Sequence, residues 1–306
     1  MFRKHRLAFL DQMQSGDIAL FPGAGHVTRN HDVEFPFRQN SDFAYLTNFH
    51  EPNAFLLLAK DLPDIPEETL FVLPKDPLKE TWTGRRTGPE GAVEKFGMAS
   101  AENLDVLEEK LKAAMASAGR MWFRLGAFPK TEALVVRFVD DLRMKIRMGI
   151  EPPQVFLDPG TALHEQRLFK SEEELTCMRK AASVSAEAHL LAMAQTKPGM
   201  KEYEIDALLS FTFRRHGGQG AGWSYPSIVA GGDHANILHY TQNDAVLNDG
   251  DLLLIDAGAE LHGYAADITR TFPVNGTYTS AQKDVYEVVL SAMDASIQRC
   301  LAGVPF

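Results

Sequence analysis

Cysteine is scarce in this 306-residue sequence, which contains only Cys177 and Cys300. Two cysteines at this spacing build neither a disulfide framework nor a metal site, so a reducing, cytoplasmic location is the default expectation. A run of about 18 apolar residues, the minimum for a membrane-spanning helix, is also absent. Positive charge is in deficit, because 31 Lys and Arg against 41 Asp and Glu leave a formal net charge of −10. These absences argue against a nucleic-acid partner and against a membrane partner.

Several common catalytic motifs are missing as well. The sequence has no P-loop and no GxSxG, and His164-Glu165 lacks the second histidine of HExxH. The glycines of HGGQGAG, residues 216–222, are followed by Trp223 where a dinucleotide-binding loop needs a further glycine. Hydride transfer, zincin-type proteolysis and esterase chemistry are therefore disfavoured, and we interpret the glycines as a helix end followed by a loop.

What is present is an ordinary globular composition, 45% hydrophobic and 24% charged, with a length that suggests two domains. Helix and strand signals alternate through residues 1–165, which predicts an α/β first domain. A segment rich in proline and glycine, residues 149–161, is the expected linker. Predicted strands cover residues 17–21, 43–46, 54–59, 70–73 and 121–125, and predicted helices cover residues 1–14, 101–118 and 130–148.

The second domain, residues 166–306, is expected to begin with helices and to continue with strands, so the chain as a whole is of the α/β (α+β) class. Ser171 followed by Glu174 is a capping-box pattern that starts a helix reaching about Gln195. Further helices are predicted for residues 201–215 and 280–301, and strands for residues 227–230 and 237–240.

A β-hairpin with two aspartates is predicted between Asp251 and Val274. Residues 252–255 are an apolar run that ends at Asp256, and residues 265–272 alternate in polarity around Asp267. A turn centred on Leu261 and His262 would pair the two aspartates directly across the strands, with Cβ atoms roughly 4.5–5.5 Å apart. A β-bulge would spoil that register.

Two carboxylates that close, in otherwise apolar strands, repel each other unless a proton or a cation lies between them. The pattern therefore predicts a metal pair, although a single strand aspartate can also simply face solvent. Oxygen ligands alone favour manganese, magnesium or calcium, whereas sets that include histidine extend to zinc, cobalt and iron.

Three further side chains are candidates beside this hairpin. His239 follows the apolar run Ile237-Leu238 in the strand predicted before the hairpin, and is either a hydrogen-bonded core histidine or a catalytic one. Tyr225 is either a core aromatic or the wall of a binding pocket. Trp82, in the segment TWTGRR, is expected to be a partly buried anchor.

Several segments resemble those of the bacterial aminopeptidase P family, the Xaa-Pro aminopeptidases among the pita-bread metallopeptidases. They are RQNSDFAYLTNFHEPNAFLLL, ETWTGRRTGPEGA, HEQRLFKSEEE, SIVAGGDHANILHYTQND and GDLLLIDAGAELHGYAADITRTFPVNG, in this order from about Thr28 onward. The resemblance implies a domain of the creatinase or prolidase type in residues 1–165 and a pita-bread catalytic domain from residue 166. It also implies two divalent metal ions, manganese first and cobalt or zinc as alternatives.

By the same resemblance Asp256 chelates one metal ion, Asp267 bridges both, and His239 is the catalytic histidine on the substrate side. Trp82 and Tyr225 are predicted to contact the substrate, a peptide with proline in second position. Since the family's tryptophan reaches a neighbouring subunit, a homodimer or homotetramer is expected.

The resemblance also implies three further ligands, one histidine and two glutamates, which the family carries beyond the point that corresponds to Phe306. The family removes the first residue, one at a time, from peptides with proline in second position. Without the three further ligands, we expect the 306-residue chain to be inactive as it stands. The alternatives are a non-catalytic pita-bread binding module and a prolidase that acts on dipeptides.

Overall fold

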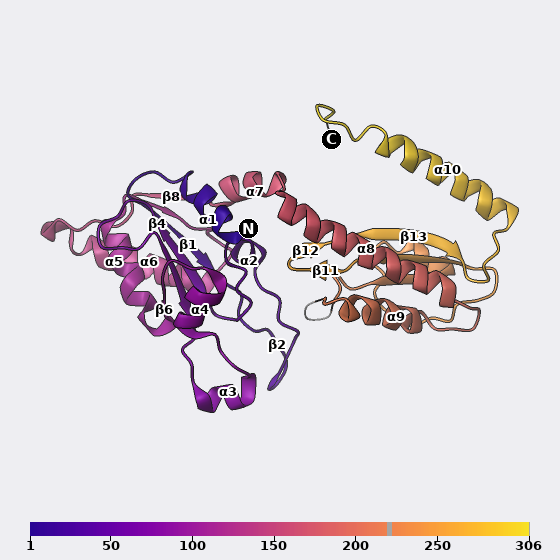
Figure 1. The fold of residues 1–306 in the computed structure, drawn as a ribbon, viewed down its shortest axis with the longest axis horizontal. Helices are drawn as coiled ribbons and strands as arrows, with labels where there is room; N and C mark the ends of the chain where they lie inside the picture. The colour runs from indigo at the N-terminus through magenta and orange to yellow at the C-terminus, as the bar shows by residue number, and fades with distance from the viewer. Residues whose placement is uncertain (219–221, 306) are drawn as a thin grey trace. The chain divides into compact units, whose positions relative to one another are not determined.

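The computed structural model describes residues 1–218 and 222–305. The chain divides into two compact units, Met1–Leu175 and Thr176–Phe306 (Figure 1). The division lies later than residue 165, where the sequence led us to expect it. The predicted loop at residues 216–222 includes positions 219–221, which lie outside the described residues.

A six-stranded mixed sheet forms the centre of the first unit, in the order β6-β5-β4-β1-β7-β8. β1 pairs antiparallel with β4 and parallel with β7, and β8 continues the parallel part of the sheet. The bounds are β1 Asp17–Pro22, β4 Phe55–Ala59, β5 Glu68–Val72, β6 Ala101–Asn103, β7 Arg120–Trp122 and β8 Val155–Leu157, with a separate ribbon of β2 Thr28–Asn30 and β3 Val33–Glu34.

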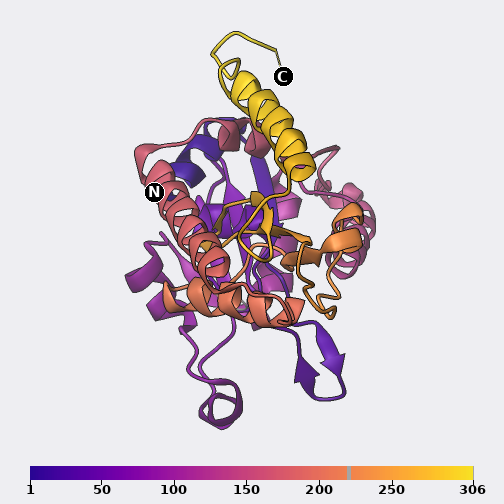
Figure 2. The ribbon, with the colours of Figure 1, turned by 90° about the vertical axis from the view of Figure 1, so that its right-hand side faces the viewer.

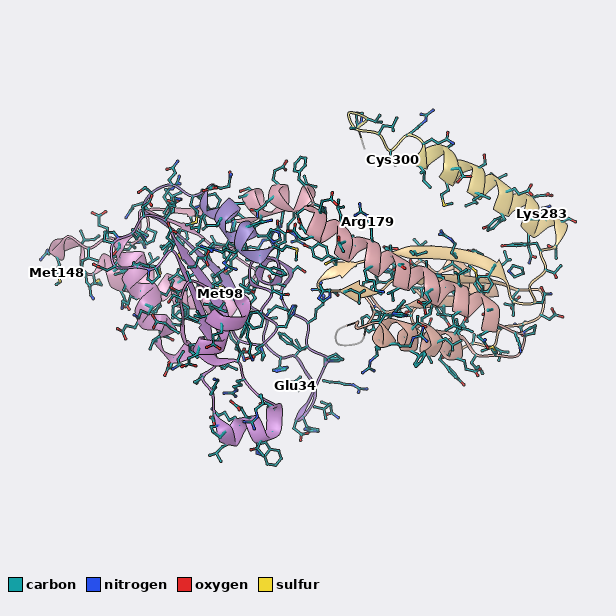
Figure 3. All side chains as sticks on the ribbon, in the orientation of Figure 1. Glu34, Met98, Met148, Arg179, Lys283 and Cys300 are labelled. Atoms are coloured by element: carbon teal, nitrogen blue, oxygen red, sulfur yellow. The ribbon has the colours of Figure 1, made fainter. Side chains whose placement is uncertain are left out.

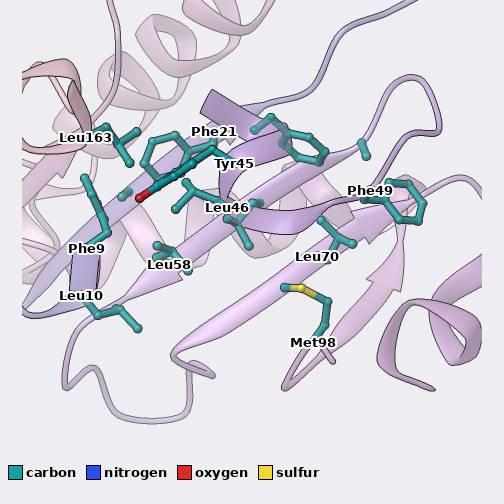
Figure 4. Packing of buried hydrophobic residues seen from close by; sticks show 14 of the residues in the cluster. Phe9, Leu10, Phe21, Tyr45, Leu46, Phe49, Leu58, Leu70, Met98 and Leu163 are labelled. Atoms are coloured by element: carbon teal, nitrogen blue, oxygen red, sulfur yellow. The ribbon is translucent and has the colours of Figure 1, made fainter. Parts of the chain in front are cut away.

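Helices cover both faces of this sheet, because the side chains of β1 alternate between two apolar cores. Ala19 and Phe21 join the core shown in Figure 4, whereas Ile18 and Leu20 join the core formed with α5 and α6. The helices are α1 Phe2–Leu10, α2 Ser41–Thr47, α3 Pro77–Thr83, α4 Gly88–Phe96, α5 Leu107–Ser117, α6 Pro129–Arg143 and α7 Gly160–Leu168, with short 3-10 helices η1 Leu104–Val106 and η2 Ile146–Met148.

Two predictions for the first unit are wrong at the level of single elements. The predicted strand at residues 43–46 is part of α2, whose first turn is capped by the Asn40 side chain, which accepts from Asp42 N and Phe43 N. A short apolar run does not distinguish a strand from a buried helical turn. The predicted helix at residues 101–118 begins only at Leu107, since residues 101–103 form β6.

The proline-rich stretch at residues 149–161 is not a linker. β8, which lies within it, pairs with β7 along three residues, and α7 begins at its end. Gln166 of α7 donates from Nε2 to the His5 carbonyl oxygen at 2.9 Å, which ties α7 to α1. This stretch is therefore part of the first unit's fold, and that unit extends past residue 165.

The second unit has two helices packed against a three-stranded antiparallel sheet in the order β13-β10-β9. Leu253, Ile255 and Ala257 of β10 enter the core with apolar residues of α8 and α9, while Asp256 lies on the other face. The elements are α8 Glu172–Gln195, α9 Glu202–Arg215, β9 Ile228–Gly231, 3-10 helix η3 Gly232–Asn236, β10 Leu252–Ala257, β11 Glu260–Leu261, β12 Tyr264–Ala265, β13 Ile268–Pro273 and α10 Ser280–Ile297.

The ends of these helices follow the predicted pattern in part. Ser171 N donates to Glu174 Oε2 at 2.7 Å and Glu174 N donates to Ser171 Oγ at 3.3 Å, which confirms the capping box at the start of α8. By contrast, residues 237–240 are not a strand: they form a turn after η3.

Helix α10 stands apart from the sheet and from α8 and α9 in both views of the ribbon (Figure 2). It has no buried residue, and Val285, Val288 and Val289 are each more than 60% exposed. Lys283 near its start and Cys300 just beyond its end are labelled in Figure 3, and both lie away from the sheet. Among the described residues, no helix is both long and apolar enough to cross a membrane.

Candidate metal centre

The two aspartates of the hairpin are not directly opposed. β10 and β13 pair Asp256 with Thr269, and the β11–β12 ribbon pairs Leu261 with Tyr264. The turn thus consists of His262 and Gly263, both with positive φ, at 53° and 80°. Two consecutive residues with positive φ are typical of a type I′ hairpin turn. The predicted pairing is wrong because the turn lies one residue further along the chain, which shifts each pair by two residues.

The same shift keeps Asp256 and Asp267 on one face of the sheet, as diagonal neighbours. Both carboxylates reach the hydroxyl of Tyr225, which lies 2.5 Å from Asp256 Oδ1 and 3.0 Å from Asp267 Oδ1. A phenol carries one proton, so it can donate to only one of the two at a time. The two carboxylates therefore converge on a single point, as the sequence predicted, by a different register.

The phenol is held in its protonated form. Burial raises the pKa of Tyr225 far above its usual value, and the hydrogen bonds and negative charges of Asp256 and Asp267 raise it further. Tyr225 is thus a hydrogen-bond donor to the acidic pair at neutral pH. Tyr225 was expected to be either a core aromatic or the wall of a binding pocket. In the structure its hydroxyl lies beside both carboxylates.

A close backbone crossing fixes the offset of the two aspartates. A Cβ at Gly258 would lie 1.7 Å from the Ala266 carbonyl oxygen, so only glycine fits where the strands meet. Ser224 Oγ lies 2.8 Å from the Gly258 carbonyl oxygen and 3.0 Å from that of Ala266. Ser224 precedes Tyr225, and these contacts therefore bring the phenol to the carboxylates.

Two polar residues of α8 support the hairpin from the core side, and sequence reasoning missed both. Ser185 Oγ accepts from Ala259 N at 2.9 Å, and His189 Nε2 lies 3.1 Å from the Ala257 carbonyl oxygen. Burial lowers the pKa of His189, whose side chain is almost inaccessible. The available signal was their spacing of four residues on the apolar face of a helix.

His239 lies in the turn after η3 with its side chain exposed. The next residue, Tyr240, is buried and packs with Ile228 and Ala230 of β9. Ile228 pairs with Asp256 across the sheet, so the Tyr240 ring covers the face that carries the carboxylate. The segment with His239 thus lies against the carboxylate face, although it is not the strand that the sequence predicted.

Trp82 is not a partly buried anchor. It belongs to α3, a helix of the first unit without buried residues, and is 89% exposed. The structure brings together Asp256, Asp267 and Tyr225, and leaves Trp82 on an open surface of its own unit.

The carboxylates of Asp256 and Asp267 converge at the Tyr225 hydroxyl, and this set of oxygen ligands suits a hard divalent cation. Within residues 1–218 and 222–305, no group of three or more His, Cys, Asp and Glu side chains is arranged to hold a metal ion.

Two family models match this chain: the aminopeptidase P N-terminal domain over residues 2–122 and metallopeptidase family M24 over residues 176–306. The Xaa-Pro aminopeptidase of Escherichia coli is 40% identical over 297 residues, which cover 97% of this chain and 67% of the relative. That of Haemophilus influenzae is 39% identical, covering 99% and 67%.

Solved structures agree in fold over nearly the whole chain. Pseudomonas aeruginosa aminopeptidase PepP is 41% identical with a TM-score of 0.95, covering 100% of this chain and 68% of that one. The Zn-substituted E. coli aminopeptidase P in complex with product is 40% identical with a TM-score of 0.93, covering 97% and 67%. With an N-terminal aminopeptidase P domain and a pita-bread domain, this chain belongs to the aminopeptidase P family of M24 metallopeptidases.

Proposed function

We propose that this protein releases the N-terminal residue from peptides with proline in second position. The observation that carries the proposal is the convergence of the Asp256 and Asp267 carboxylates on one point of the sheet. Relatives about 40% identical over nearly the whole chain are named Xaa-Pro aminopeptidases, and one similar solved structure is a Zn-substituted aminopeptidase P in complex with product.

In this proposal Asp256 is a ligand of one divalent metal ion and Asp267 is shared by two, with manganese as the first candidate and cobalt or zinc as alternatives. Metal ions bound there would acidify a water molecule and polarise the peptide carbonyl. Tyr225 would hold the two carboxylates in place with its single proton, and its own contact with substrate stays a prediction.

His239 is proposed to face the substrate, since its side chain is exposed on a segment that covers the carboxylate face. Exposed Ile237 and Leu238 precede it and offer an apolar surface. The bond before proline has no N–H, so a site that asks for no amide hydrogen bond and offers apolar contacts accepts it.

The test is release of the first residue from an Xaa-Pro-Yaa tripeptide with added manganese, and the matched substrate is Xaa-Ala-Yaa. It is run on the 306-residue chain and on a version extended beyond Phe306. We expect metal-dependent cleavage of the proline peptide by the extended version. Cleavage of the alanine peptide alone would contradict the proposal. Cleavage of Xaa-Pro dipeptides alone would contradict it as well and would identify a prolidase.

That the 306-residue chain has no activity of its own stays a prediction. Metal-dependent release by this chain at a rate near that of the extended version would refute it. A complete lack of activity in both versions, with metal still bound, would favour a non-catalytic binding module.

Metal content tests the roles of the two aspartates. In the extended version, Asp267→Asn should abolish binding of two metal ions, because the shared carboxylate is lost. Titration calorimetry that still shows two tight sites would contradict the bridging role. His239→Ala should lower kcat more than it lowers metal affinity, and an unchanged kcat would exclude the catalytic role.

A homodimer or homotetramer is proposed on the exposure of Trp82, which leaves a large apolar side chain free for a neighbouring copy. Sedimentation of the wild type and of Trp82→Ala tests it, and a monomeric wild type would exclude it. A cytoplasmic location is proposed as well, since the sequence has only two cysteines, too few for a disulfide framework.

A further inference from the structure

Glu202 is the first residue of α9 and is completely buried. Its carboxylate accepts four hydrogen bonds, two on each oxygen. Oε1 accepts from Gly231 N at 2.9 Å and from His234 Nδ1 at 3.3 Å, and Oε2 accepts from the Tyr240 hydroxyl at 2.7 Å and from Ala245 N at 2.9 Å.

All four donors lie on one segment, residues 231–245. Gly231 and Ala245 are its two ends, and the side chains of His234 and Tyr240 come from its middle, with their rings stacked at 4.5 Å. One carboxylate thus closes a loop of 15 residues that contains the turn with His239. Between the two middle anchors, Ile237 and Leu238 are 53% and 87% exposed, so the tip of the segment is held mainly through Tyr240.

The hydrogen bonds from this segment stabilise the negative charge of Glu202. Burial alone would raise the pKa of Glu202, but the bonds from Gly231, Tyr240, Ala245 and His234 lower it instead. A buried carboxylate is costly unless donors surround it. Burial and the bond to Glu202 in turn raise the pKa of Tyr240 to about 12, so its hydroxyl stays a donor.

The anchored residue is also the one that meets the sheet. Tyr240 packs on Ile228 and Ala230, the β9 residues on the face of Asp256. Tyr240 therefore contacts Glu202 through its hydroxyl and the Asp256 face of the sheet through its ring. His239 is the residue next to it in the sequence.

We propose that Glu202 is a positioning residue for His239: it holds the 231–245 segment against the Asp256 face and so sets where the imidazole meets substrate. The proposal rests on the proposed function for the role of His239, but the placement of His239 can be tested without it. Glu202 itself touches no substrate in this view.

The first experiment needs no catalysis. Amide hydrogen exchange and imidazole NMR are recorded on the 306-residue chain as wild type, Glu202→Gln, Tyr240→Phe and Tyr278→Phe, well below their melting temperatures. His239→Ala identifies the His239 ring signal, and His26 of the first unit is the reference. Tyr278→Phe is the matched control, because it also removes one bonded hydroxyl, which donates to the Thr271 carbonyl oxygen.

We expect Glu202→Gln and Tyr240→Phe to shift or broaden the His239 signal. Amide exchange at Gly231 and Ala245 should become about tenfold faster or more, because these amides lose hydrogen bonds that protect them. Tyr278→Phe and the His26 signal should be unaffected. An unchanged His239 signal in Tyr240→Phe, or the same change in Tyr278→Phe, would overturn the proposal. If Glu202→Gln does not fold, the Tyr240→Phe result decides.

The second experiment uses the extended version and an Xaa-Pro-Yaa tripeptide. Tyr240→Phe should lower kcat roughly 10- to 100-fold, the cost of a misplaced catalytic group, with KM changed much less. Combined with His239→Ala it should add nothing, since both changes act through the same imidazole. Additive losses would overturn the proposal. If the wild type does not cleave the peptide, the proposed function fails, and the NMR result still decides the placement of His239.

Discussion

Asp17 at the start of β1 is a buried carboxylate in the first unit and is 1% exposed. Arg120 donates to both of its oxygens at 2.7 Å, and Trp122 Nε1 and Gln14 N donate at 2.9 and 3.0 Å. Burial opposes the charge, but these donors lower the pKa of Asp17 below its usual value. The bonds join β1 to β7, so the charge contributes to the pairing of the parallel strands.

Asp17→Asn should lower the free energy of unfolding by about 3 kcal/mol at pH 7, because one partner of a buried charge pair is lost. Since the folded pKa lies below the unfolded one, the wild-type advantage is complete above about pH 4 and disappears as the pH falls through the folded value. Denaturant unfolding of wild type and variant from pH 7 to pH 3 measures it.

Asp105→Asn, at an exposed aspartate, is the matched control and should change stability little. A difference between Asp17→Asn and wild type that grows toward acid pH would contradict the assignment.

At this scale the sequence predicted residue types and missed contacts. Asp256, Asp267 and Tyr225 were recognisable, since carboxylates in apolar strands and a nearby aromatic carry a chemical signal. Glu202 was not, because its four partners lie 29 to 43 positions along the chain and look like ordinary loop residues. Only the folded segment shows that they converge on one carboxylate.

Among the elements, β10 and α10 are both rich in aliphatic residues but contribute differently to stability. Leu253 of β10 is 0% exposed in the core against α8 and α9, while Val288 of α10 is 70% exposed. Apolar content alone therefore does not say which element holds the unit together.

Leu253→Ala should cost about 2–5 kcal/mol, because it leaves a cavity in a packed core. Val288→Ala should change stability by no more than about 0.5 kcal/mol, as a surface substitution does. Urea unfolding of both variants in the 306-residue chain compares them. A larger loss for Val288→Ala than for Leu253→Ala would show that α10 is covered in solution.

Element types were predictable where a long periodic pattern or a capping box existed, as for α8 and α9. They were not for short apolar runs: residues 43–46 became helical under the Asn40 cap, and residues 237–240 became a turn held by Tyr240. The hairpin register was missed because the dipeptide His262-Gly263 is a less familiar type I′ turn than Asn-Gly.

Across the whole molecule, each unit has apolar cores of its own. Among the residues that the structure describes, the cores of the first unit contain none beyond Leu163, and those of the second contain none before Ala181. Units with separate cores can unfold separately.

Calorimetry of the 306-residue chain should therefore show two transitions. Leu253→Ala should lower the melting temperature of one, and Asp17→Asn that of the other, because each change lies in a different core or sheet. A single transition lowered by both variants would mean that the units unfold as one.

The division after Leu175 falls inside α8, which is helical without interruption over Glu172–Gln195. Proteases cut chain that can be drawn out into an extended form, and a packed helix must first unfold locally to be cut. Mild digestion should thus spare the junction and nick exposed turns within either unit first. A fragment that expresses the second unit alone has to begin before Glu172, where α8 starts. A cut after Leu175 would separate the first turn of α8 from the rest of the helix, which carries Ser185 and His189.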